Sequence, residues 1–146
     1  LIFYSTNLSS WRNIPGILAQ LHAGDLNADG RADLAGLTAS GLIFYSTNLS
    51  SWRNIPGILA QLHAGDLNAD GRADLAGLTA SGLIFYSTNL SSWRNIPGIL
   101  AQLHAGDLNA DGRADLAGLT ASGLIFYSTN LSSWRNIPGI LRAFAE

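Results

Sequence analysis

The chain consists of near-perfect tandem copies of a 41-residue unit. Residues 1–41, 42–82 and 83–123 are identical, and a fourth copy runs from Leu124 to Leu141 before the sequence changes at 142–146. Because identical units form the same local structure, we expect a stack or ring of equivalent modules. Perfect identity over three copies favours an engineered chain over a recent natural duplication.

The period of 41 residues is typical of a four-stranded propeller blade, and helical HEAT and armadillo repeats share that length. Each unit contains proline and several glycines, which interrupt any helix of useful length. Four apolar or β-branched runs predict strands at residues 20–25, 33–38, 42–47 and 51–55, with Pro56 and Gly57 ending the last one. Trp52 falls on this outermost strand, and the small residues Ala23 and Gly24 suit the innermost strand. The sequence therefore predicts an all-β fold, a β-propeller of 41-residue blades joined as a meander.

The repeat boundaries divide the chain into a half blade and three full blades. The outer hairpin covers residues 1–19, and the blades cover 20–60, 61–101 and 102–146, the last with an altered tail. Closed propellers usually contain 4–8 blades. We therefore expect the chain to pair with itself as a homo-oligomer, most simply a dimer that completes the ring. Exchange of identical hairpins at the junction and a larger ring both remain open.

A polar loop connects the first two strands of each blade. Carboxylate or amide oxygens occupy loop positions 1, 3, 5 and 9, and glycine at position 6 permits a sharp turn. This spacing matches the first part of a calcium loop, with a backbone carbonyl at position 7. Position 12 is Gly36 and the flanking segments are strands, so an EF-hand is excluded. The alternative is an Asx-rich turn without metal. The predicted Ca²⁺ ligands are Asp25, Asn27, Asp29, Arg31, Asp33, Asp66, Asn68, Asp70, Arg72, Asp74, Asp107, Asn109, Asp111, Arg113 and Asp115.

The loop segment Gly-Asp-Leu-Asn-Ala-Asp-Gly-Arg-Ala-Asp-Leu at residues 24–34 resembles the FG-GAP/VCBS repeat of integrin α-type propellers. That resemblance implies a propeller with structural calcium. Some propellers with this repeat are lectins. This chain departs from the family at Ala28, Ala69 and Ala110, where glycine is frequent. Alanine there is strained if the position requires a positive φ. The Trp-x-x-Ile-Pro-Gly segment is also similar to tectonin-type lectins.

A tryptophan followed by an arginine recurs in every unit. Neighbouring strand residues point to opposite faces, so one of the two packs between blades and the other faces solvent. A tryptophan ring can stack on the apolar face of a sugar, and arginine and tyrosine can donate hydrogen bonds to its hydroxyls. The alternative is that tryptophan simply packs in the core. The candidate glycan-binding residues are Trp11, Arg12, Tyr45, Trp52, Arg53, Tyr86, Trp93, Arg94 and Trp134.

Two further patterns recur once per unit. His22, His63 and His104 lie near the inner strand, where we expect a structural or channel-lining role; a ring of imidazoles there could also trap a transition metal. Asn-Leu-Ser, as at Asn48, matches the glycosylation acceptor pattern, but we expect it to form the turn before the outer strand.

Composition excludes several functional classes. The formal net charge is −2, and all eight basic residues are arginines, so no basic nucleic-acid footprint is present. No apolar run approaches the ~18 residues of a membrane span. Cysteine is absent, and no nucleophile motif or asymmetric catalytic constellation occurs. We therefore expect a non-enzymatic scaffold with calcium loops and glycan-binding ancestry, or a purely structural self-assembling protein. The sequence indicates no cellular location.

Overall fold

The computed structural model describes residues 1–141, and β-strands are the only regular secondary structure in that range. A short hairpin, β1 (Ile2–Tyr4) and β2 (Arg12–Ile14), precedes three four-stranded antiparallel sheets. The first sheet contains β3 (Gln20–Gly24), β4 (Asp33–Leu37), β5 (Leu42–Ser46) and β6 (Arg53–Ile58). The second sheet contains β7 (Gln61–Gly65), β8 (Asp74–Leu78), β9 (Leu83–Ser87) and β10 (Arg94–Ile99). The third sheet contains β11 (Gln102–Gly106), β12 (Asp115–Leu119), β13 (Leu124–Ser128) and β14 (Arg135–Ile140).

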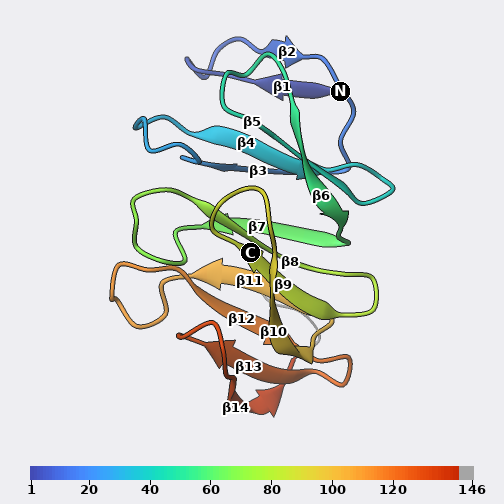
Figure 1. Cartoon of the computed structure of the whole chain (residues 1–146), viewed down its shortest axis with the longest axis vertical. Helices are drawn as coiled ribbons and strands as arrows, with labels where there is room; N and C mark the ends of the chain where they lie inside the picture. The colour runs from blue at the N-terminus through green and yellow to red at the C-terminus, as the bar shows by residue number, and fades with distance from the viewer. Residues whose placement is uncertain (142–146) are drawn as a thin grey trace.

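Each sheet is a meander in which consecutive strands pair side by side. Figure 1 shows the sheets stacked along the long axis of the molecule, from the blue hairpin β1–β2 to the red strands β13 and β14. The all-β, propeller-like prediction is confirmed at this level, and one sheet falls within each predicted unit. The altered tail at 142–146 lies outside the described residues. Among residues 1–141 no helix is long and apolar enough to cross a membrane.

The outermost strand differs from the prediction. The turn signal of Pro56 and Gly57 predicts that it ends at Ile55, but β6 continues through both residues to Ile58. A register shift permits this continuation: Ile55 pairs with Ile43, and Ile58 pairs with Leu42. Proline is tolerated here because an edge strand leaves its N–H side unpaired, and the bulge takes up the extra residues. Trp52, predicted on this strand, lies one residue before it.

The inner strands of neighbouring sheets approach closely, since β7 contacts both β3 and β11. Gly24 allows this approach: a Cβ there would lie 2.8 Å from the Cβ of Ala73. The amide of Ala73 also donates to the carbonyl of Asp25 at 2.6 Å, which ties the second sheet to the first loop. Gly24 thus needs to be small for the next sheet to approach, and the predicted place of this strand nearest a propeller axis stays a prediction.

The apolar core lies between sheets. One cluster joins Leu26, Ile43 and Ile55 of the first sheet to Leu62 and Leu75 of the second, all five side chains being buried. An equivalent cluster joins the second sheet to the third. The second strand is buried on both faces, as β8 shows over its whole length. Each sheet therefore depends on its neighbour to cover its apolar face.

Identical residues consequently differ in exposure along the stack. Leu67 is 2% exposed at the second junction, whereas the equivalent Leu108 of the third sheet is 54% exposed. At the other end, Leu21 is 43% exposed and its equivalent Leu62 is fully buried. These differences arise from neighbouring sheets alone, because the local sequence is the same.

Gly65 and Gly106 form a matched pair for testing this stacking. A Cβ on Gly65 would lie 2.9 Å from the Cβ of Ala114, whereas a Cβ on Gly106 would meet no atom within 4 Å. Overpacking a tight contact costs about 1–3 kcal/mol. We expect Gly65→Ala to lower the free energy of unfolding by that amount and Gly106→Ala to leave it nearly unchanged, as measured by urea denaturation. Equal effects of the two substitutions in dilute solution, where no second copy covers Gly106, would show that the sheets are not stacked as described.

Candidate functional site

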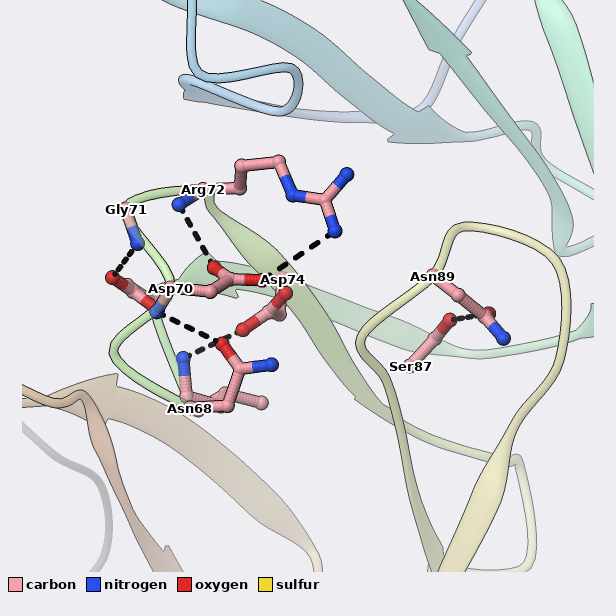
Figure 2. A network of polar contacts seen from close by, with 9 residues as sticks. Asn68, Asp70, Gly71, Arg72, Asp74, Ser87 and Asn89 are labelled. Atoms are coloured by element: carbon pink, nitrogen blue, oxygen red, sulfur yellow. Dashed lines mark hydrogen bonds and ion pairs between the residues drawn. The ribbon is translucent and has the colours of Figure 1, made fainter.

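The acidic loops are organised by their own side chains, as Figure 2 shows for the loop between β7 and β8. The two carboxylate oxygens of Asp66 accept from the amides of Asp70 at 3.1 Å and Gly71 at 2.9 Å. Asp70 in turn accepts from the amide of Arg72 at 2.9 Å. These bonds are those of the predicted Asx-rich turn, and they pull the carboxylates toward one another.

Asp74 is the buried member of this loop. It begins β8, is 2% exposed and accepts from the amide of Leu67 at 2.8 Å. Burial, with smaller contributions from the negative charges of Asp70 and Asp66, raises the pKa of Asp74 to about 6. The pKa of Asp33 is raised for the same reasons. Asp70 differs, because the amide of Arg72 bonds its carboxylate and lowers its pKa.

The aspartates of each loop converge on one point. Each triplet has one carboxylate oxygen per residue, and the three oxygens lie within 4.8 Å of one another. Two of the carboxylates are more accessible and the third is buried, so a cation could enter from solvent and contact all three. Asparagines 27, 68 and 109 lie in the same loops, between the first two aspartates. The triplets are Asp25, Asp29 and Asp33; Asp66, Asp70 and Asp74; and Asp107, Asp111 and Asp115.

The loop arginines lie beside the second aspartate of each triplet. Nitrogen–oxygen distances are 3.7 Å for Arg31 and Asp29, 3.5 Å for Arg72 and Asp70, and 3.5 Å for Arg113 and Asp111. Each arginine thus offsets part of the local negative charge. Their predicted role as carbonyl ligands stays a prediction.

The backbone of each acidic loop is strained at the alanine that stands where FG-GAP/VCBS repeats often have glycine. Ala28, Ala69 and Ala110 adopt φ values of 61°, 61° and 60°. An L-residue in the left-handed region costs about 1–2 kcal/mol. The hydrogen bonds of the surrounding aspartates hold the alanines in this conformation.

The tryptophans divide into one exposed and three partly buried residues. Trp11 is 71% exposed. The indole nitrogens of Trp52, Trp93 and Trp134 donate to the carbonyls of Pro15, Pro56 and Pro97 in the preceding repeat, at 2.9, 2.9 and 3.0 Å. Each of these tryptophans thus bridges two repeats, while the following arginines 53, 94 and 135 are exposed.

A pocket opens beside each bridging tryptophan. The pocket at Trp93 has a volume of about 180 Å³ and an apolar lining that includes Phe85, Ile58 and Leu59, with Thr79 at its wall. Equivalent pockets lie beside Trp52 and Trp134, with volumes of about 220 and 180 Å³. Three of the predicted glycan-binding tryptophans therefore line concave sites between repeats.

The other candidate glycan-binding residues are not among those that line these pockets. Tyr45 and Tyr86 pack against the apolar clusters, and Arg12, Arg53 and Arg94 face solvent. The pocket lining from Gly57 to Leu59 does not follow from the sequence pattern. The segment Pro-Gly-Ile-Leu is typical of a strand end, but here it forms a bulge that faces the next repeat.

The Asn-Leu-Ser segments form turns, as expected. Asn48 accepts from the amides of Ser50 and Ser51, both at 3.0 Å, and Leu49, between Asn48 and Ser50, has a φ of 58°. Figure 2 shows the equivalent Asn89 bonded to Ser87.

The histidines lie in a row across the inner strands. The ring centroids of His22 and His63 are 5.2 Å apart, and those of His63 and His104 are also 5.2 Å apart. Burial, followed by the charges of the two neighbouring histidines, lowers the pKa of His63 to about 4.

The sequence matches no protein-family model, and no curated protein matches it.

Trp93 and Trp11 provide a test of the bridging contact. Trp93→Phe removes the bond to Pro56, which lies at the surface where water can reach the carbonyl, and should cost about 0.5–1.5 kcal/mol of unfolding free energy. Trp11→Phe changes an exposed side chain and should alter stability by less than about 0.5 kcal/mol. Chemical denaturation measures both, and a cost for Trp11→Phe as large as that for Trp93→Phe contradicts the bridge.

The lowered pKa of His63 predicts a pH dependence of stability. Between pH 6.5 and about 4 the unfolded chain binds a proton at this residue that the folded chain does not. His63 should therefore reduce the free energy of unfolding as the pH falls through that window, and contribute no pH dependence above it. The difference between the stability curves of the wild type and His63→Gln isolates this effect from the carboxylates. Parallel curves from pH 7 to 4 would refute it.

Proposed function

We propose that this protein is a non-enzymatic repeat scaffold of the propeller type that binds calcium in its acidic loops and ligands between its repeats. The observation that carries the proposal is the recurrence of an aspartate triplet with oxygens within 4.8 Å at three equivalent positions. Every group capable of chemistry recurs in each unit, which suits a multivalent binding protein better than an enzyme. An engineered origin stays a prediction.

The chemistry of the loops favours calcium over softer metals. Their ligands are carboxylate and amide oxygens, which hard cations prefer, and the chain has no thiols. Three carboxylates this close repel one another, and a bound cation would remove that cost and lower the pKa of Asp74. The resemblance of residues 24–34 to FG-GAP/VCBS loops supports the same cation.

Calorimetric titration with CaCl₂ tests the loops. We expect binding to three sites and a higher melting temperature with calcium than with EDTA, because a ligand of the folded state stabilises it. Asp66→Asn should remove one of the three sites, and Asp25→Asn is the matched variant in another loop. The absence of both binding heat and a calcium-dependent melting shift would eliminate the metal from the proposal.

The pockets beside Trp52, Trp93 and Trp134 support carbohydrate binding. Each offers an aromatic wall at a concave site, and repeated weak sites gain strength by avidity. A glycan array tests this assignment, with the three tryptophans replaced by alanine and Trp11→Ala as control. If the wild type binds no glycan at high protein concentration, carbohydrate binding by these pockets is ruled out.

A second candidate function is self-assembly, and the exposure of the stack's end faces favours it. Leu108 and Ile137 are 54% and 43% exposed on the third sheet, yet the equivalent Leu67 and Ile96 are covered by the next repeat. On the first sheet, Leu21 is exposed where Leu62 is covered. The internal junctions pair equivalent faces, which supports this fit for the inner strands; the hairpin β1–β2 already covers the outer part of the first sheet's face, where Trp52 bonds Pro15. A second copy of this chain is therefore a complementary partner, and two copies are the simplest closed arrangement.

Native mass spectrometry of the 146-residue chain tests self-assembly. We expect a discrete dimer that Leu108→Gln and Leu21→Gln each disrupt, because they alter opposite faces of one junction. Ser9→Gln, in the exposed turn of the first hairpin, is the control. A monomer at every concentration would contradict self-assembly and leave the calcium test unaffected.

A further inference from the structure

The row of histidines, which we name the histidine ladder, consists of His22 in β3, His63 in β7 and His104 in β11. Each lies at the centre of an inner strand, and each pairs across its own sheet with an alanine. Successive ring planes are inclined by 53° and 46°. The imidazoles of successive sheets are therefore close, evenly spaced and not stacked face to face.

The spacing within the ladder is fixed by residues on the same strand face. Two residues before His22, the Gln20 amide donates to the carbonyl of Ala60 at 2.7 Å and accepts from the amide of Leu62 at 3.3 Å. Two residues after His22, Gly24 permits the close approach to the next sheet. Gln61 makes the equivalent bonds from the second sheet to the third, at 2.8 and 3.2 Å. Rigid strands clamped on both sides are the kind of element that holds ligand groups in place.

A centroid separation of 5.2 Å is compatible with two imidazoles that bind one tetrahedral ion. With metal–nitrogen bonds of about 2.0–2.1 Å, each ring centroid lies about 3.2 Å from the ion. At an angle of about 109°, two such centroids are separated by about 5.2 Å. Both steps of the ladder have this separation.

We propose that the histidine ladder binds a borderline divalent transition metal, with Zn²⁺ as its representative, between neighbouring imidazoles that share His63. One ion occupies either the step from His22 to His63 or the step from His63 to His104. Nitrogen ligands separate this site from the acidic loops, whose oxygen ligands select hard cations. The inference is independent of the proposed calcium and glycan sites.

Zinc calorimetry on the full chain, with the loops saturated by calcium, tests the ladder. Because even an outer-shell change costs 10–100-fold in metal affinity, His63→Gln should weaken zinc binding by at least about tenfold. His22→Gln and His104→Gln each leave one complete step, so affinity should fall only by about a factor of two, the loss of one of two equivalent positions. The double variant His22→Gln/His104→Gln leaves His63 without a partner in the ladder and should bind as weakly as His63→Gln. Circular dichroism without metal checks that every variant folds.

Three outcomes would overturn the proposal. The first is that the wild type binds no zinc. The second is that His63→Gln, or the double variant if His63→Gln does not fold, binds zinc as well as the wild type. The third is that calcium displaces the zinc, which would assign the metal to the acidic loops.

Discussion

The face-to-face contact between neighbouring sheets is the interaction on which this structure depends. Within each sheet the meander satisfies the backbone, but the apolar side chains of one face are covered only by the next repeat. Leu26 and Ile55 are buried because Leu62 and Leu75 lie against them. Gly24 lets β3 come close to Ala73, in the loop before β8 of the next sheet. The same contact creates the tryptophan bridges, the pockets beside them and the spacing of the histidines. Fold and candidate sites thus share one origin.

Much of the fold could be predicted from the period and from turn chemistry. The repeat gave four strands per unit, and their predicted bounds agree closely with β3, β4 and β5. The predicted end of the outer strand is wrong because Pro56 and Gly57 carry a strong turn signal in isolation. Their continuation in β6 depends on an edge position and a bulge against Leu42, which are tertiary features. Local propensity predicts where a chain can turn, and neighbouring strands decide whether it does.

The candidate sites differ in the same way: the acidic loops form within one repeat, and the other sites form between repeats. The acidic loop is local, so the spacing of Asp25, Asp29 and Asp33 was sufficient to predict that their oxygens converge. The pocket at Trp93 combines groups from two repeats, among them Ile58 and Phe85, and no spacing within one unit reveals it. The histidine row was visible as a recurrence, but its 5.2 Å steps follow only from the distance between sheets. Sites within a repeat could be predicted, and sites between repeats required the structure.

Equivalent leucines in two environments test most directly whether contact between sheets stabilises this protein. Leu67 and Leu108 have the same local sequence, and they are 2% and 54% exposed. Truncating a buried leucine costs about 2–5 kcal/mol. In dilute solution, the free energy of unfolding of Leu67→Ala should fall by that amount, and that of Leu108→Ala by less than half as much. Equal losses for the two variants would contradict the claim that contact between neighbouring sheets, rather than the structure within each repeat, stabilises this protein.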